Sequence, residues 1–197
     1  MQDSDELARR LAFMAGHVEA GIALYRAGEG ESGAPHLLHP VSEAYAEERE
    51  GLDAIGFDPA PFQAVSQALE NGRPAAEIEP QLKAVEANLA MMREKAGGKP
   101  DELIAYLMKL TVEEYGIGVT DGAVSDPGEY QDAWGFAVVA RQIAPQLPAG
   151  DSEAVIEQLD ALISLWPENA PIVTGNPASP ESVIRQAARV NELLLGA

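Results

Sequence analysis

Apolar residues recur every three or four positions along almost the whole chain, which is the spacing of one face of an α-helix. The first stripe of this kind consists of Leu7, Leu11, Met14, Val18, Ile22 and Tyr25. Gly28, Gly30 and Gly33 follow closely and are expected to end the helix. A second stripe predicts a helix from about Pro35 to Ile55, and we expect Pro40 to break its first turn.

The same spacing predicts a short helix after Asp58-Pro59 and a longer one from about Ala75 to Lys95. A further helix, with its apolar face on Leu103, Leu107, Leu110 and Ile117, is expected to stop at Asp121-Gly122. Asp126-Pro127-Gly128-Glu129 has the form of a capping box with proline at the first helical position, so it should open the next helix.

Asp151 or Ser152 should begin another helix, and Ser179-Pro180 should cap the last one. No segment shows a convincing strand pattern, and no repeat has a fixed period. The sequence therefore predicts an all-α helical bundle of seven to eight helices. We expect residues 1–197 to form one domain, with a two-lobed split near 97–100 as the alternative.

Composition agrees with packed helices. Hydrophobic residues make up 46% of the 197 residues, so the chain can build a core and wholesale disorder is not expected. Aromatic residues make up only 6%, while alanine and leucine are abundant. The 13 basic and 32 acidic residues give a net charge of −19, which excludes nucleic acid as a partner and attracts cations. A surface that only keeps the protein soluble is the plain alternative.

The chain has no cysteine, so thiolate metal sites, disulfides and thiol catalysis are all excluded. No window approaches the length of a transmembrane helix. The start, from Met1 to Asp5, does not resemble a signal peptide. An exported protein with this sequence would therefore begin here as a mature chain after removal of its signal.

The three histidines of the chain, His17, His36 and His39, fall within one short stretch, and Glu43 follows the last of them by one helical turn. Imidazole and carboxylate groups are common ligands of transition metals. The spacing H-x-x-H-x-x-x-E puts His36, His39 and Glu43 on one helix face. If the first two helices form an antiparallel hairpin with its turn between Gly28 and Gly33, His17 and Glu43 lie at similar heights, about 15 Å from the turn.

These four residues are therefore predicted to hold a metal ion, and binding should weaken as the pH falls through about 6.5 because imidazole must be neutral to bind. The structural alternative is that the histidines are hydrogen-bonded residues of the core or its boundary. Met14, one turn from His17, is expected to pack in the core.

A second group of candidate ligands is acidic. Glu114 and Asp121 continue the stripe of Leu107 and Leu110, and Glu129 and Asp132 continue the stripe of the following helix. Buried carboxylates need cations, helix N-terminal amides or solvent as partners, and the chain has few basic residues. A metal is thus one interpretation for this group. Alternatively, Glu129 serves the capping box and Asp121 serves the Asp-Gly turn.

Part of this acidic segment resembles a known motif. Glu114-Tyr115, Gly118-Val119, Asp121-Gly122, Val124, Glu129-Tyr130 and Asp132 are similar to the pattern D-Y-x-x-A-V-x-D-G-x-V…E-Y-x-E. That pattern is typical of the periplasmic helical domain of bacterial high-affinity iron permeases and of imelysin-like iron-uptake proteins. The clear match covers about 20 residues, and the H-x-x-E signature of imelysins is absent.

The resemblance implies an exported, periplasmic helical bundle that handles iron or copper for uptake, delivery or storage, with zinc as a further candidate ion. It also implies that Glu114, Asp121, Glu129 and Asp132 are the acidic residues of the motif. The expected partners are the metal ion and a membrane transporter or redox protein.

Three other interpretations remain open. The first is a haem-binding protein with His17 or His39 as the axial ligand, and the second is a non-catalytic scaffold or interaction module. The third, an enzyme with ferroxidase chemistry, is less expected because the tandem E-x-x-H motifs of such centres are missing.

Overall fold

The computed structural model describes residues 2–43, 49–167, 171–173 and 175–196, and it describes side chains only for 5–37 and from 51 onward within these ranges. These residues form nine α-helices, two short 3₁₀ helices and one two-stranded hairpin, which confirms the all-α fold class. The chain divides into two compact units, Met1–Gly97 and Gly98–Ala197. Within the described residues, no helix is both long enough and apolar enough to span a membrane.

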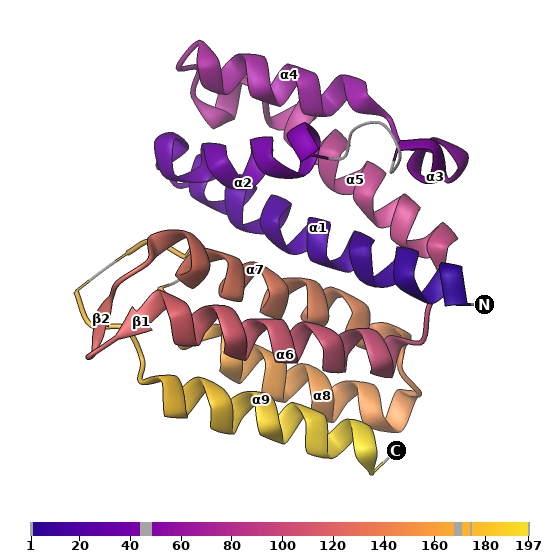
Figure 1. The fold of residues 1–197 in the computed structure, drawn as a ribbon, viewed down its shortest axis with the longest axis vertical. Helices are drawn as coiled ribbons and strands as arrows, with labels where there is room; N and C mark the ends of the chain where they lie inside the picture. The colour runs from indigo at the N-terminus through magenta and orange to yellow at the C-terminus, as the bar shows by residue number, and fades with distance from the viewer. Residues whose placement is uncertain (1, 44–48, 168–170, 174, 197) are drawn as a thin grey trace. The chain divides into compact units, whose positions relative to one another are not determined.

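The first unit is built from four long helices and two short ones (Figure 1). Helices α1 and α4 each pack against both α2 and α5, so these four helices enclose one core. The elements of this unit are α1 (Gln2–Arg26), α2 (Gly30–Glu43), α3 (Arg49–Ala54), α4 (Pro59–Glu70), η1 (Ala75–Glu77) and α5 (Glu79–Ala96).

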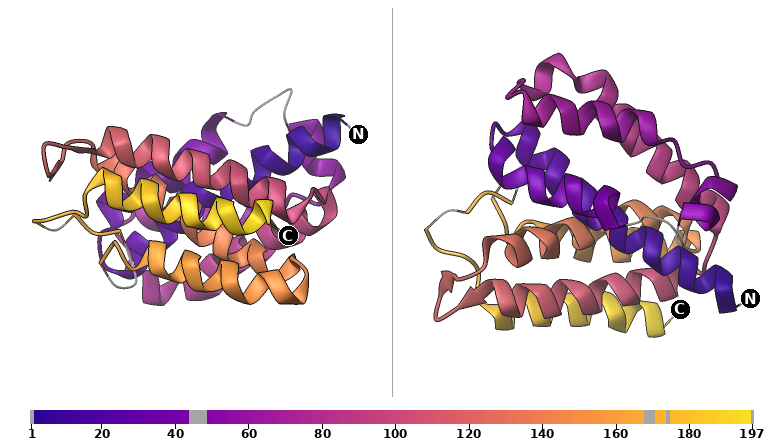
Figure 2. Two further views of the ribbon diagram at one scale, coloured as in Figure 1. Left: turned by 90° about the horizontal axis from the view of Figure 1, so that it is seen from below. Right: turned by 45° about the horizontal axis from the view of Figure 1, so that its top comes forward.

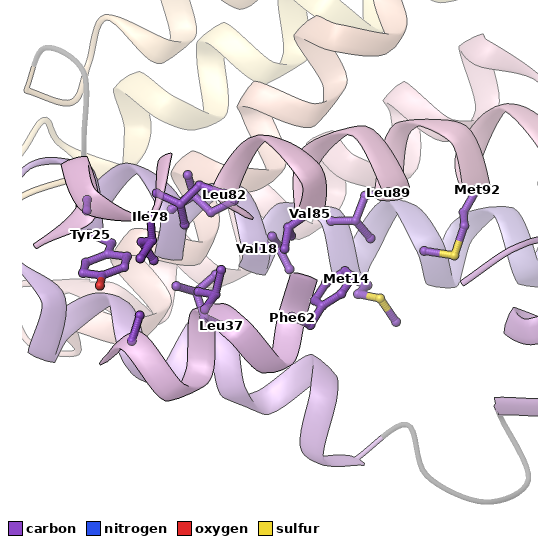
Figure 3. Close-up of a cluster of buried hydrophobic side chains, with 14 of the residues drawn as sticks. Met14, Val18, Tyr25, Leu37, Phe62, Ile78, Leu82, Val85, Leu89 and Met92 are labelled. Atoms are coloured by element: carbon purple, nitrogen blue, oxygen red, sulfur yellow. The ribbon is translucent and has the colours of Figure 1, made fainter. Parts of the chain in front are cut away.

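The predicted apolar stripe of α1 forms one wall of this core. Met14 and Val18 of α1 lie near Phe62 of α4, and Leu89 and Met92 of α5 line the same end of the cluster (Figure 3). Met14 is only 8% exposed, so its predicted role in core packing is confirmed.

A tight turn joins α1 to α2. Gly28 has a φ of 88°, and its N–H and that of Glu29 donate to the carbonyls of Tyr25 and Leu24, which is the hydrogen-bonding pattern of a Schellman C-cap. Because this cap closes the helix within two residues, α2 begins at Gly30 rather than near Pro35. The prediction that Pro40 breaks the helix was wrong, since α2 continues to Glu43.

The predicted helix from Pro35 to Ile55 is therefore not continuous. Its ends correspond to α2 and α3, and residues 44–48 between them lie outside the described part of the chain. This division accounts for the ninth helix where seven or eight were predicted.

The second unit is a four-helix bundle in which each helix packs on two others, in the ring α6–α7–α8–α9. Its helices are α6 (Pro100–Gly118), α7 (Pro127–Ile143), α8 (Ala149–Ile163) and α9 (Pro180–Leu195), and the 3₁₀ helix η2 (Ala144–Gln146) follows α7. Helices α6 and α9, which lie far apart in the sequence, run side by side (Figures 1 and 2). Asp126 and Ser179 cap α7 and α9 as predicted.

The buried face of α6 differs from the predicted one. Ile117 is 56% exposed and Leu110 is only partly buried, whereas the buried positions are Ile104, Leu107, Met108, Thr111, Tyr115 and Gly118. The buried face of α6 was predicted about one residue out of phase. Thr111 and Gly118 are buried but are not apolar side chains, so the spacing of apolar residues did not include them. Thr111 is accommodated in the interior because its hydroxyl donates to the carbonyl of Leu107 at 2.9 Å.

A short hairpin follows α6, where the sequence pattern showed no strand. Strands β1 (Val119–Thr120) and β2 (Ala123–Val124) pair antiparallel, with Val119 opposite Val124. Asp121 and Gly122 form the turn, and both have positive φ, 53° and 75°. Two consecutive left-handed residues match the twist of a tight hairpin, and Asp-Gly is a sequence that favours it. Helix α6 thus ends at Gly118 and not at Asp121-Gly122.

Candidate metal centre

The end of α6 is held against the start of α7. A methyl group added at Gly118 would come within 2.5 Å of the Tyr130 nitrogen, so the two backbones meet in van der Waals contact at this point. The hydroxyl of Ser125 donates to the carbonyl of Ile117 at 3.1 Å, and the N–H groups of Ser125 and Asp126 donate to the carbonyl of Gly118. These contacts fix the register between the last turn of α6 and the first turns of α7.

This register brings two of the four predicted acidic ligands into contact and leaves a third near enough to act on them electrostatically. Glu114 lies one turn before Gly118 on α6, and Glu129 and Asp132 lie one turn apart on α7. The carboxyl groups of Glu114 and Glu129 share a hydrogen bond, and Asp132 is close enough to act electrostatically on Glu114. Asp132 is buried, whereas Glu114 and Glu129 are partly exposed.

The electrostatics of this acidic cluster, defined as Glu114, Glu129 and Asp132, favour a cation or a proton. Burial, the hydrogen bond to Glu129 and the repulsion from neighbouring carboxylates raise the pKa of Glu114 to about 8. Every charged group that acts on Glu114 is another carboxylate, including the exposed Glu113. At neutral pH the Glu114 carboxyl therefore keeps its proton and donates it to Glu129.

The fourth predicted acidic ligand, Asp121, is not part of this cluster. It is exposed at the tip of the hairpin, and it is not among the groups that act on Glu114. Asp121 serves the Asp-Gly turn, which was the structural alternative. Glu129, by contrast, is hydrogen-bonded through its carboxyl group to Glu114, while the N–H of Asp126 that a capping box would engage donates to Gly118 at 3.2 Å.

Three aromatic rings pack beside the cluster in the bundle interior. Tyr115 and Tyr130, each next in sequence to a cluster carboxylate, lie with their ring centroids 5.7 Å apart, and Trp166 meets Tyr115 edge-on at 5.0 Å. The indole N–H of Trp166 donates to the carbonyl of Tyr130 at 3.1 Å, and the Tyr115 hydroxyl donates to the carbonyl of Ala178 at 2.9 Å. These contacts anchor the backbone that carries Glu114 and Glu129.

The first unit brings two of the predicted histidines together. A ring nitrogen of His17 on α1 and one of His36 on α2 lie within 4.8 Å of each other. His36 is buried, and His17 is partly buried with its ring edge-on to Phe13 at 4.5 Å. His39 and Glu43 also belong to α2, but their side chains lie outside the described part of the chain.

His36 lies opposite His17, where Glu43 was expected, because α2 begins five residues earlier than predicted. The same early start moves each residue of α2 further from the turn.

The first unit also contains a cavity of about 850 Å³, between the α1–α2 turn and the segment that joins α4 to η1. Tyr25, Arg26, Leu69 and Arg73 are among its lining residues, and none of the described side chains that line it is a histidine.

The residues that position the acidic cluster were not found from the sequence. Gly118, Ser125 and Trp166 are not metal-ligand residues, so the pattern of candidate ligands in the sequence does not include them. The sequence does contain a signal for the positions of Gly118 and Ser125. Asp121-Gly122, flanked by Thr120 and Ala123, predicts a tight hairpin. A hairpin at that point requires the chain to reverse directly after Gly118.

Comparison with known families links the second unit to iron transport. Residues 101–196 match the family model of the iron permease-associated 4-helix bundle domain. This match supports an iron permease-related helical domain in the second unit and covers α6 to α9. Comparison with curated proteins and with solved structures gives no match.

Proposed function

We propose that this protein is an exported iron-binding protein that takes part in iron uptake, and that the acidic cluster of the second unit holds the iron as cargo. The observation that carries the proposal is the hydrogen-bonded pair Glu114 and Glu129, with Asp132 acting on Glu114 electrostatically, within the unit that matches an iron permease-associated domain. Delivery to, or receipt from, a membrane transporter follows from this context as part of the proposal.

The chemistry of the donor groups supports iron as the ion. Carboxylates from facing helices of a four-helix bundle hold iron, together with histidines, in the di-iron carboxylate proteins. All three histidines of the chain lie in the first unit, and the three residues of the acidic cluster itself offer carboxylate oxygen ligands. It thus suits a cation that accepts carboxylate oxygen, and it lacks the thiolate ligands that Cu(I) prefers.

The protonated state of the cluster fits reversible binding. Iron entering the cluster would displace the proton that Glu114 shares with Glu129, so binding is in competition with a proton. Competition with a proton makes the affinity of the cluster for iron lower than that of a fully ionised site. A site that carries iron as cargo has to release it. The cluster therefore fits transient carriage better than permanent retention.

Metal retention tests the proposal. The purified protein is dialysed separately against iron, copper and zinc, freed of loose metal on a desalting column, and analysed for metal content. We expect stoichiometric retention of iron, and loss of that iron in Glu129→Gln, which keeps the size of the side chain and removes its charge.

Glu113→Gln is the matched control, because Glu113 is adjacent in sequence, carries the same charge and is exposed, with Lys109 as its ion-pair partner at 3.5 Å. This variant should retain iron like the wild type. Equal loss of iron in the two variants would show that iron binds through general surface charge and not at the acidic cluster. Absence of iron from the wild type would overturn the proposed function.

A further inference from the structure

The first unit contains a close helix crossing that the iron site does not use. A methyl group added at Gly21 of α1 would come within 2.6 Å of the Leu37 side chain and 3.0 Å of the Gly33 carbonyl. Conversely, a methyl group at Gly33 of α2 would come within 2.7 Å of the Gly21 carbonyl. The two helices therefore touch backbone to backbone at this pair of glycines.

His17 and His36 lie on the same side of this crossing, one on each helix. His17 precedes Gly21 by four residues and His36 follows Gly33 by three, so each is about one turn beyond the contact point on the side away from the α1–α2 turn. This symmetry explains why their ring nitrogens lie within 4.8 Å of each other. Larger residues at positions 21 and 33 would separate the helices and the two rings.

The structure assigns His17 and His36 as a bis-imidazole site for a divalent transition metal of borderline character, namely Cu²⁺, Ni²⁺ or Zn²⁺. Neutral imidazole is a good ligand for these ions, and Cu²⁺ binds most strongly in the general order of affinities. Both histidines belong to the first unit.

The geometry is close to what two ligands of one ion require. Ligand nitrogens at about 2.0–2.1 Å from a tetrahedral ion lie roughly 3.3 Å apart. A separation of up to 4.8 Å is brought into this range by rotation of the side chains about χ1 and χ2. The edge-on contact of Phe13 at 4.5 Å limits the orientations of the His17 ring, so rotation of the His36 ring is the expected adjustment.

The charge of the protein also favours a cation. Two neutral imidazoles bring no negative charge to offset a divalent ion, but the chain as a whole carries a net charge of −19. The resulting negative potential raises the local concentration of cations around the molecule. Water can complete the coordination sphere, because two protein ligands leave positions of the ion open.

Electron paramagnetic resonance of the full-length protein with one equivalent of Cu²⁺ tests this assignment. We expect nitrogen hyperfine splitting from two imidazoles in the wild type. His17→Gln and His36→Gln should each lose this pattern, with a fall in Cu²⁺ affinity of at least about tenfold, because a single imidazole remains.

Two controls separate the histidine pair from other sites. His39→Gln tests the third histidine and should keep the two-nitrogen pattern. Glu114→Gln/Glu129→Gln removes two of the three carboxylates of the acidic cluster and should also keep it. Circular dichroism of each metal-free variant checks that it folds. A wild-type spectrum in either His17→Gln or His36→Gln, or oxygen ligands alone in the wild type, would overturn the assignment.

A measurement on the wild type avoids any effect of substitution on folding. Imidazole ¹⁵N resonances are recorded by NMR before and after one equivalent of Zn²⁺ is added. We expect the ring nitrogens of His17 and His36 to shift. Shifts confined to His39, or no shift at all, would show that the pair is only part of the helix packing.

Discussion

Glu114 is the residue on which the account of the acidic cluster depends most. Its position on α6 faces Glu129 and Asp132 of α7, and the combination of burial and like charge raises its pKa to about 8. A carboxyl group that is neutral at pH 7 can donate a hydrogen bond, so the cluster is held together by a proton when no cation is bound. The properties of the metal-free protein should therefore depend on this proton.

Glu114→Gln should stabilise the metal-free protein at pH 8. A group whose pKa is higher in the folded state binds more protons there than in the unfolded chain, so its stabilisation is complete below pH 4.5 and is lost as the pH rises through 8. Glutamine donates the same hydrogen bond at every pH. Because Glu114 is partly exposed, we expect only about 1 kcal/mol, or a rise in Tm of roughly 2–4 °C.

Thermal unfolding followed by circular dichroism at pH 4 and at pH 8 measures this effect. The two proteins should have the same Tm at pH 4, where Glu114 is protonated in the wild type as well. A lower Tm of the variant at pH 8 would mean that Glu114 is ionised and stabilised by a partner, contrary to the electrostatics described above.

The pH dependence of iron affinity provides a second prediction at this scale. Since iron must displace the proton of Glu114, the affinity should rise about tenfold for each pH unit between pH 6 and 7 and level off above pH 8. Anaerobic titration calorimetry with Fe²⁺ in two buffers of different ionisation enthalpy also counts the protons released. An affinity that is constant from pH 6 to 8 would exclude Glu114 as a ligand.

At the scale of elements, the junction of α6 and α7 determines the site. The bundle brings the two helices together along their length, but the contact of Gly118 with the backbone of Tyr130 and the hydrogen bonds of Ser125 set their register. The hairpin β1–β2 reverses the chain within a few residues, so α7 starts directly beside the end of α6. Glu114 and Glu129 meet because of this register.

Gly118→Ala should disrupt the site and the fold together. The new methyl group would lie 2.5 Å from the Tyr130 nitrogen, and a backbone atom cannot move aside as a flexible side chain does. We expect a loss of about 1–3 kcal/mol in the free energy of unfolding, typical of overpacking, and weaker iron binding. Chemical denaturation and iron retention measure the two effects.

Gly116→Ala is the matched control for this substitution. Gly116 lies in the same helix two residues earlier, and a methyl group there meets no atom within 4 Å. Because alanine favours the helix over glycine, this variant should gain about 0.5–1 kcal/mol. A similar loss of stability in both variants would indicate a general effect on α6 instead of a clash with Tyr130.

The elements themselves could be predicted from the sequence better than their contacts. Caps such as Asp58, Asp126 and Ser179 act through local hydrogen bonds, so their sequence signals are reliable. The face of α6 and the partner of His17 depend instead on where two helices touch. Glycine at positions 21, 33 and 118 decides those contacts, and periodicity of apolar residues does not reveal which glycines pack and which only end a helix.

At the scale of the whole molecule, the two units offer different ligand chemistry. The first unit contains all three histidines, and the second contains the acidic cluster and the match to the iron permease-associated domain. The match lies outside the first unit, so only the short motif of the second unit could be recognised from the sequence. The two types of ligand should select different ions, oxygen ligands for iron and imidazole for Cu²⁺, Ni²⁺ or Zn²⁺.

The most direct test of the central claim is to locate the iron. A crystal of the protein loaded with one equivalent of iron is measured with X-rays above and below the iron absorption edge, and the anomalous difference map shows where the ion lies. If the acidic cluster holds the iron, the map shows one strong peak within bonding distance of the carboxylates of Glu114, Glu129 and Asp132. A peak elsewhere in a fully loaded crystal, with none at these three residues, would contradict it.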